Sequence, residues 1–379
     1  MNFEEHAAKP LLAQAGIRVP AGALARDPDA AASAVRKLGG ACVVKAQVPA
    51  GKRGKAGGIK LARTSDEARA HARAILGMEI GSHRVEKVLV EELSDIAREL
   101  YAAVLNDPGS KGPMVMFSTE GGMDIEEIAV ESPEKLRKRP VDIRRGFTRE
   151  DAGAMVSGLD LSGAGGSVAD TLEKLYQAYV RNDAELLEIN PLIVTSGGEV
   201  VALDCKYTMD DSAIKRHPEL SQRCAPEKLT ALESRGEEAG IKYIELDGDV
   251  GVLANGAGMT MTTMDVVRYH GGAPANFCEI GGEAYTKGRT AMALVLAKSG
   301  VRSLVVNFCG AFARCDVMMD GVLNAWAELN PAIPVFFSVA GTGDEEAIRM
   351  LKERLGRDPL PDMSEACKAA VDAAREGGP

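Results

Sequence analysis

Two oxygen-bearing side chains, Asn190 and Asp204, lie on either side of a glycine-containing turn. Asn190 is at the end of the apolar run 187–190, Asp204 ends the run 200–204, and the turn lies at 196–198. This pattern predicts a hairpin, in which neighbouring strands are about 5 Å apart. Two hard oxygen ligands at that spacing can share one Mg²⁺ whose other partners are waters and phosphate oxygens. The pair therefore predicts a metal–nucleotide site.

A basic, glycine-rich loop follows a predicted strand that ends near Lys45. Residues 50–58 contain four glycines and three cations, among them Arg53. The backbone N–H groups of such a loop can approach an anion closely, and its cations balance the anion's charge. The residue order of a Walker loop is missing, and a basic surface hairpin is the alternative interpretation. Lys45 upstream and the oxygen pair downstream favour phosphate binding.

Two acidic residues frame the next region. Glu91 ends a predicted strand, where backbone groups can take the edge of an adenine, and Glu99 interrupts a strand that is otherwise apolar. Both are therefore candidate binding residues. Glu92 and Asp95 are interpreted as part of a solvated face.

Glycine turns also follow predicted strands in the second half of the chain. One turn, 255–258, joins a buried strand to a helix, and 307–316 is a second strand end. Ligands of open α/β sheets bind at the carboxyl ends of strands, where helix N-termini offer free N–H donors. Both turns can therefore face one bound carboxylate. A third turn, 279–283, is equally consistent with glycines that only allow tight packing.

The chain shows no recognisable nucleophile of its own. No histidine stands beside a paired carboxylate and a Ser or Cys in a recognisable order, and His270 is expected to close a helix. The attacking group is therefore expected to belong to the substrate or to another subunit. The histidines are His6, His71, His83, His217 and His270.

Composition narrows the class of protein. The 379 residues carry a net charge of −10, which disfavours non-specific binding to nucleic acid. The acidic N-terminus does not resemble a signal peptide, and no apolar run approaches the ~18 residues of a membrane span. The seven cysteines are irregularly spaced, which favours free thiols over disulfides or a zinc site. A cytoplasmic location is expected.

Apolar patterning predicts the elements that position these residues. A chain of this length is expected to form two or three domains. Residues 206–240 are polar and are interpreted as a linker with one or two helices, and Ser65 is expected to cap a helix. In the first part we expect strands at 41–46, 58–61, 88–91, 98–105 and 114–118, and helices at 29–38, 65–76 and 169–181.

After the predicted linker, strands and helices alternate. This rhythm predicts a parallel, doubly wound sheet. The expected strands are 250–253, 275–279, 303–307 and 334–338, and the expected helices are 259–270, 286–299, 316–329 and 344–355.

Together these motifs resemble the β subunit of succinate–CoA ligase (succinyl-CoA synthetase) and, more broadly, the β subunits of ADP-forming acyl-CoA synthetases. The resemblance runs nearly from end to end. It implies an α/β protein with an α+β part: an ATP-grasp nucleotide-binding domain over 1–240, then a flavodoxin-like, doubly wound ligase domain over 241–379. The segments that carry it are 8–9, 43–47, 53–58, 99–101, 118–122, 188–192, 255–258, 263–265, 274–277 and 314–316.

The resemblance implies a reaction in three steps with an α subunit as partner. Phosphate passes from the nucleotide to a histidine of the α subunit, the phosphohistidine activates a small carboxylic acid as an acyl phosphate, and the CoA thiol displaces the phosphate. It implies Mg²⁺ and ATP, with GTP as an alternative, and an αβ or α₂β₂ assembly. The α subunit would carry the phosphohistidine and the CoA site.

The resemblance also implies a role for individual residues. Lys45, Arg53 and Gly54 would hold phosphates. Glu91 and Glu99 would contact the nucleoside. Asn190 and Asp204 would hold Mg²⁺, and Glu188 would orient the partner's phosphohistidine. Asn255 and the loop Gly310, Ala311 and Phe312 would grip the substrate carboxylate.

Two turns depart from the family's pattern. Residues 307–312 replace the usual Asn-Ile-Phe-Gly-Gly-Ile, so that Ala311 stands for a glycine and Phe312 for an aliphatic residue. Residues 279–283 replace Asp-Val-Gly-Gly-Gly, with an extra residue before Lys287. Discrimination between acids depends on such contacts. Succinate is the expected acid, and malate, citrate, sulfoacetate or a similar acid are alternatives, as is a non-catalytic nucleotide-binding assembly subunit.

Overall fold

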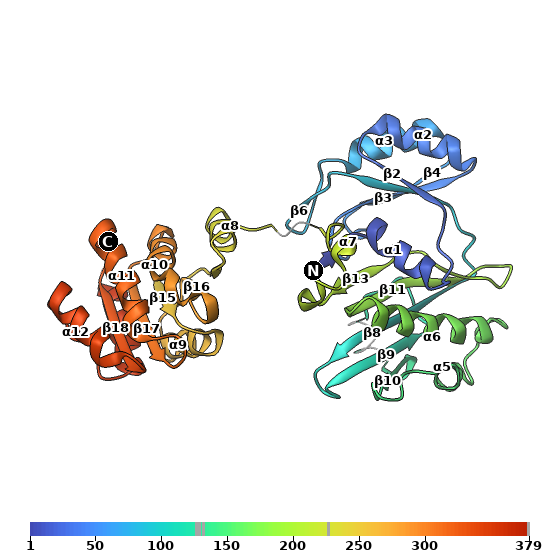
Figure 1. Cartoon of the computed structure of the whole chain (residues 1–379). Coiled ribbons are helices and arrows are strands. Elements are labelled where there is room, and N and C mark those ends of the chain that lie inside the picture. Colours follow the sequence, from blue (N-terminus) through green and yellow to red (C-terminus); the bar gives the residue numbers. More distant parts are fainter. Residues whose placement is uncertain (126–129, 131–132, 226–227, 377–379) are drawn as a thin grey trace. The chain divides into compact units, whose positions relative to one another are not determined.

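The chain divides into two units, Met1–Pro226 and Glu227–Pro379. The structure, a computed structural model, describes residues 1–125, 130, 133–225 and 228–376, and its elements are labelled in Figure 1. The division falls before helix α8 (Ala231–Glu238), which packs on β14 (Lys242–Glu245) and α10 (Gly288–Ala297) of the second unit. The sequence-based boundary at 240 lies between α8 and β14 (Lys242–Glu245).

A four-stranded antiparallel sheet, ordered β2-β7-β3-β4, carries Lys45 and Glu91 in the first unit. Helices α2 and α3 cover one face (Figure 1), with small alanines at the contact. The predicted cap Ser65 is wrong by one residue, because the Thr64 side chain accepts from the backbone N of Glu67 at 3.1 Å. The elements are β2 (Gly22–Ala25), α2 (Pro28–Leu38), β3 (Cys42–Ala46), β4 (Ile59–Ala62), α3 (Ser65–Ile75), β5 (Glu79–Ile80), β6 (His83–Arg84) and β7 (Val88–Glu92).

A larger sheet carries the predicted hairpin. Its order is β1-β13-β11-β8-β9-β10, with β12 paired to β11, and α1, α5 and α6 contribute to its core. Its elements are β1 (Asn2–Phe3), α1 (Glu5–Gln14), β8 (Arg98–Asp107), β9 (Gly112–Ser118), β10 (Leu136–Pro140), α5 (Arg149–Val156), α6 (Gly165–Arg181), β11 (Ala184–Val194), β12 (Val200–Ala202), β13 (Lys206–Met209) and α7 (Pro218–Ser221).

The prediction that the linker begins at 206 is wrong, because 206–209 form strand β13 between β1 and β11. Tyr207 and Met209 are buried, and the Tyr207 ring packs on Phe3 with centroids 4.7 Å apart. Four residues of alternating burial are too short a pattern to stand out in a polar segment.

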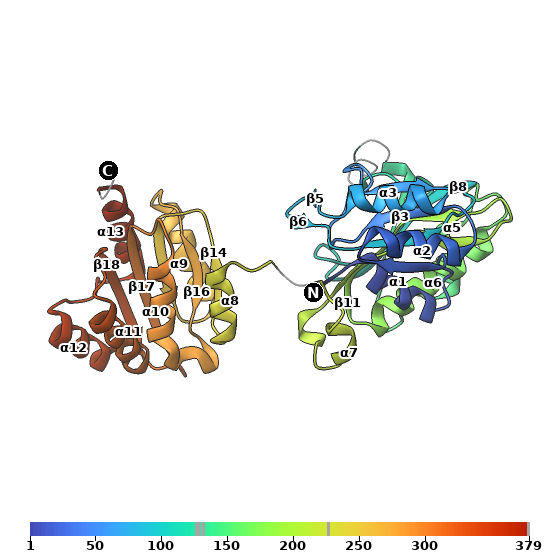
Figure 2. The ribbon, with the colours of Figure 1, turned by 90° about the horizontal axis from the view of Figure 1, so that it is seen from above.

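The second unit is a doubly wound sheet, as predicted. Its order is β14-β16-β15-β17-β18, in which β15 to β18 are parallel and β14 is antiparallel. One core cluster gathers α10, α11 and α12, and another gathers α9 and α13 on the opposite face; the elements can be followed in Figure 2. The elements are β15 (Val250–Ala254), α9 (Ala257–Tyr269), β16 (Asn276–Glu279), α10 (Gly288–Ala297), β17 (Ser303–Gly310), α11 (Cys315–Leu329), β18 (Val335–Gly341), α12 (Asp344–Leu355) and α13 (Met363–Glu376).

None of the helices within the described residues has both the length and the apolar character needed to cross a membrane.

A buried amide joins two strands of this sheet. Asn276 is 0% exposed; its Oδ1 accepts from the backbone N of Val252 at 3.1 Å, and its Nδ2 donates to the Val252 carbonyl at 2.8 Å. The side chain thus satisfies both backbone groups of Val252 where the β15–β16 ladder has no pairing of its own.

Replacing Asn276 by Ala should destabilise the second unit by about 2–5 kcal/mol, because two buried backbone groups lose their partners. Trp326, the single tryptophan, lies in this unit, so its fluorescence during denaturant unfolding measures the change. Asn324→Ala, which alters an exposed amide on α11, is the control and should shift the midpoint far less. Equal midpoints for the two variants would contradict the assignment.

Candidate functional site

The hairpin brings the two predicted metal ligands face to face. Leu192 pairs with Ala202, and the Leu203 backbone N donates to the Pro191 carbonyl at 3.1 Å. Continuing this register places Asn190 opposite Asp204, and opposite residues of an antiparallel pair project on the same face. The predicted hairpin is confirmed, although Asn190 lies within β11 and not at its end.

The contacts of both side chains leave oxygen available to a cation. Asn190 Oδ1 accepts from the backbone N of Gly122 at 2.8 Å and its Nδ2 donates to the Met123 carbonyl at 2.8 Å. Asp204 Oδ1 accepts from Arg53 at 2.6 Å and from the Cys205 backbone N at 2.7 Å, leaving Oδ2 outside these contacts.

This donor set fits Mg²⁺ better than a metal held entirely by protein. Within the described residues, no group of three or more His, Cys, Asp or Glu side chains is placed to hold a metal ion. One amide oxygen and one carboxylate match an ion that keeps several waters and takes substrate phosphates.

Lys45 and Arg53 are buried cations beside the hairpin. Lys45 Nζ lies 2.6 Å from Glu91, 3.0 Å from Glu5 and 2.6 Å from the Leu203 carbonyl. Arg53 donates to Glu5 at 2.7 Å and to Asp204 at 2.6 Å. Burial alone would lower the pKa of both, but the carboxylates outweigh it and raise each pKa above its usual value. Both side chains therefore stay charged at neutral pH.

The loop between β3 and β4 needs a glycine at position 58 for close packing. A Cβ at Gly58 would lie 2.8 Å from the Ile80 side chain and 3.1 Å from the Arg53 carbonyl. The outer part of the loop contacts the segment after β9, where Lys55 and Lys52 pair with Asp124 at 2.7 and 3.3 Å. The predicted phosphate loop is thus held beside the hairpin.

One cavity collects most of the predicted nucleotide site. Its volume is ≈ 450 Å³, within the range of small-molecule sites. Glu188, from β11, lines it and accepts from the Tyr101 hydroxyl at 3.2 Å. The other predicted residues that line it are Lys45, Arg53, Gly54, Asn190 and Asp204.

Glu91 and Glu99 do not line this cavity. Glu91 is 2% exposed, and its carboxylate contacts Lys9 and Lys45. Glu99 is exposed at the start of β8, across from Ile193. A second cavity, of ≈ 310 Å³, lies at the turn of the hairpin and is lined by none of the predicted site residues.

Sequence analysis missed two charged residues of the site, Glu5 and Lys9. They lie one turn apart on α1, 2.8 Å from each other, and both are buried against the cations and carboxylates described above. The available signal was their spacing on the same face as the buried Ala8 and Leu12. A charged pair four residues apart more often marks a solvated helix face, so that signal pointed the wrong way.

In the second unit, side chains tie the strand ends together. Asn255 Nδ2 donates to the Cys309 carbonyl at 2.8 Å, and its Oδ1 accepts from the Cys309 backbone N at 2.7 Å. Glu279 Oε2 accepts from the backbone N of Gly256 and of Gly281, at 3.1 and 2.8 Å. The Asn255 amide thus shapes the 309–312 loop, and the Glu279 carboxylate occupies one backbone donor at the start of α9.

The predicted acid-binding loop stands at the end of β17. Gly310 has no room for a side chain, because a Cβ would lie 2.2 Å from the Thr342 carbonyl. Ala311 follows it, with its backbone N donating to the Ala313 carbonyl at 3.2 Å. Phe312 is 83% exposed and meets Tyr285 edge to face, with centroids 6.1 Å apart. The structure brings Asn255, Gly310 and Ala311 together and leaves Phe312 at the surface.

Comparisons with known proteins match both units. A family model described as an ATP-grasp domain covers residues 2–194, and one described as CoA-ligase covers 253–375. The chain is 42% identical over 382 residues, and 100% of both chains, to the β subunit of an ADP-forming succinate–CoA ligase from Rubrobacter xylanophilus. It is also 42% identical over 375 residues, and 98% of both chains, to a GDP-forming β subunit from Thermus thermophilus.

A solved structure shares the fold. The structure of ATP citrate lyase from Methanothrix soehngenii, in complex with citrate and coenzyme A, has a TM-score of 0.75 at 22% identity. The match covers 98% of this chain and 99% of that one.

A thiol reagent should react first with Cys309, because this cysteine is exposed while Cys224 is half-buried and the others are buried. The rate of labelling of the full chain, followed by mass spectrometry, measures this, and Cys309→Ser should remove the fast phase. A small carboxylic acid bound at 310–312 should slow the labelling. A fast phase that persists in the serine variant would contradict the placement of this strand end.

Proposed function

The chain belongs to the family of succinate–CoA ligase β subunits, and we propose that it joins a small carboxylic acid to CoA together with an α subunit. In this proposal, ATP phosphorylates a histidine of the α subunit, and that phosphohistidine activates the acid as an acyl phosphate. The CoA thiol then displaces the phosphate. Nucleotide binding belongs to residues 1–240 and acid binding to residues 241–379.

The observation that carries the proposal is the cavity of the first unit. In it, Asn190 and Asp204 face each other across the hairpin, beside two buried cations, Lys45 of β3 and Arg53 of the loop that follows it. Phosphoryl transfer requires chiefly positioning and charge neutralisation, and this cavity supplies both. The chain then needs no nucleophile of its own.

Each residue has a distinct part in the proposal. Lys45, Arg53 and the backbone of Gly54 hold phosphates, and Asn190 and Asp204 hold Mg²⁺, which neutralises phosphate charge when bound. Glu188, held by Tyr101, orients the incoming phosphohistidine. Asn255 acts by shaping the 310–312 loop, whose backbone N–H groups take the carboxylate.

The two remaining predicted nucleoside contacts differ in what supports them. Glu91 is enclosed by Lys9 and Lys45, so a nucleoside contact requires it to leave them. Glu99 is exposed and lies beside Gly122. Gly122 belongs to the segment after β9, which Asn190 holds by a hydrogen bond. Of the two, Glu99 is accessible to a ligand without rearrangement.

Succinate is the acid we propose. A screen of the chain with its α subunit, measuring CoA-dependent ADP release with succinate, malate, citrate, glutarate, itaconate and sulfoacetate, should show the highest kcat/KM for succinate. Preference for another acid would mean that Ala311, Phe312 and the 279–287 turn define a different ligase. No turnover with any acid, alongside Mg-nucleotide binding, would overturn the enzymatic proposal in favour of an assembly role.

Asp204→Ala should abolish Mg-nucleotide-dependent phosphorylation of the α subunit, because it removes the only carboxylate of the proposed metal site. Radiolabel transfer from γ-labelled ATP measures the loss, which we expect to exceed about 100-fold. Asp95→Ala, an exposed carboxylate outside the cavity, is the control and should label normally. Normal labelling of the Asp204 variant would refute the metal assignment.

A further inference from the structure

We propose that Glu5 of helix α1 is a positioning residue of the nucleotide site. Glu5 and Asp204 both pair with Arg53, and the Glu5 pair leaves the Asp204 carboxylate available to bind a metal ion. The inference rests on the proposed function, in which Asp204 is a metal ligand. It adds a residue that sequence analysis did not assign and gives it a role distinct from phosphate or metal binding.

Glu5 contacts all three cations of a charged cluster. The cluster consists of Lys9, Lys45, Arg53, Glu5, Glu91 and Asp204. The Oε1 atom of Glu5 lies 2.8 Å from Lys9 and 3.0 Å from Lys45, and its Oε2 lies 2.7 Å from Arg53. The amide of Gln47 donates to the same Oε2 at 3.4 Å. The residue is 2% exposed, and its three cations hold its pKa well below the usual range despite burial, so the carboxylate stays ionised.

The cluster has equal numbers of positive and negative side chains, but its carboxylates differ in how many cations they contact. Lys9 and Lys45 each contact Glu5 and Glu91, whereas Arg53 contacts Glu5 and Asp204. Asp204 is therefore the one carboxylate in the cluster that pairs with Arg53 alone. Three cations face three carboxylates, so removal of one partner leaves a buried charge uncompensated, which is strongly unfavourable.

This arrangement determines the electrostatic cost of breaking the Arg53–Asp204 pair when Asp204 binds a metal ion. With Glu5 present, Arg53 keeps a carboxylate partner at 2.7 Å after it loses Asp204. Without Glu5, Asp204 would be the only carboxylate left to a buried guanidinium, and the metal would have to compete with that pair for it. Glu5 thus lowers the cost of releasing Asp204.

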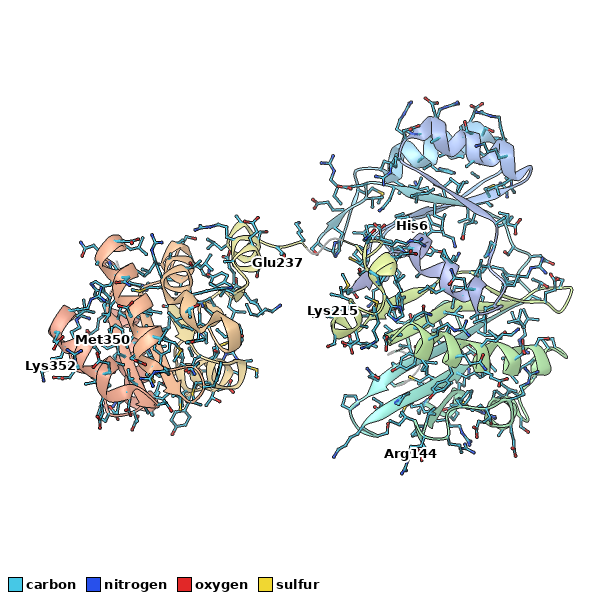
Figure 3. All side chains as sticks on the ribbon, viewed as in Figure 1. His6, Arg144, Lys215, Glu237, Met350 and Lys352 are labelled. Atoms are coloured by element: carbon cyan, nitrogen blue, oxygen red, sulfur yellow. The ribbon has the colours of Figure 1, made fainter. Side chains whose placement is uncertain are left out.

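The position of α1 suits this role. Figure 1 shows α1 between the four-stranded sheet (the small sheet) and the sheet that carries the hairpin (the large sheet). Figure 3 labels His6, the residue after Glu5, in the same place. Lys45 comes from β3 of the small sheet, and Asp204 follows β12 of the large sheet. Lys9 and Lys45 both donate to the Leu203 carbonyl, at 2.8 and 2.6 Å, and so fix the backbone next to Asp204.

The test compares ADP binding with and without Mg²⁺ in the full chain carrying Glu5→Gln. We expect the dissociation constant of Mg·ADP, measured by calorimetry, to rise about tenfold or more. The affinity for ADP without metal should stay the same or increase, because the cluster gains a net positive charge. A merely structural role would weaken both affinities together.

Glu4→Gln is the matched control. Glu4 precedes Glu5, is 9% exposed, and pairs with Lys87 at 2.6 Å outside the cluster. The substitution removes the same charge from the same end of α1, and both affinities should match those of the unaltered chain.

Glu5→Asp keeps the charge but shortens the side chain. It provides the test if circular dichroism shows that Glu5→Gln does not fold. It should show the same selective loss of Mg·ADP affinity, to a smaller extent. Unchanged affinities, or equal losses with and without Mg²⁺ in a folded variant, would overturn the inference. Asp204→Ala separates it from the proposed function: if that variant keeps full Mg·ADP affinity, the metal assignment itself fails.

Discussion

The site in the first unit depends on one constraint, the need to compensate five buried charges and a half-buried sixth. Lys9, Lys45 and Arg53 face Glu5, Glu91 and Asp204, and all but Asp204 are buried. Buried ion pairs often add little net stability compared with apolar packing. Their retention here is explained by geometry: the pairs join α1, the small sheet and the hairpin, so that cations and oxygen ligands occupy one cavity before any ligand arrives.

In the second unit, the groups that need partners are backbone N–H and C=O groups, and neutral amides and one carboxylate supply them. Its sheet carries backbone groups that would otherwise be left without partners, and Asn255, Asn276 and Glu279 satisfy them with side-chain oxygen and amide groups. Asn255 and Glu279 thereby shape turns at strand ends, and Asn276 joins two strands. In the function we propose, the surface that would face the acid is then the turn itself, so changes at Ala311 and Phe312 should affect acid choice more than a change of one side-chain donor.

Much of this architecture could be predicted from the sequence, because long periodic patterns and glycine turns encode it. The hairpin behind Asn190 and Asp204 and the alternation of strands and helices after residue 250 were recognisable for that reason. Strand β13 was not, because four residues carry too little period, and neither was the cap at Thr64, next to an equally suitable Ser65. Glu5 and Lys9 escaped because the partners that explain them, such as Glu91, lie far along the chain. The contact of the Asn255 amide with Cys309 was not predicted either, because only the folded chain places the two residues side by side.

The contact of Lys52 and Lys55 with Asp124 has a consequence for the kinetics of the site. Both lysines are more than half exposed, and such surface ion pairs contribute only about 0–1 kcal/mol each. They are also screened as ionic strength rises. The glycine-rich loop is therefore held against the segment after β9 by an attraction that ordinary salt can weaken, while the buried cluster beneath it is insulated from the same ions. We therefore expect the rate at which a ligand enters and leaves the cavity to vary with ionic strength, and its final position to be insensitive to it.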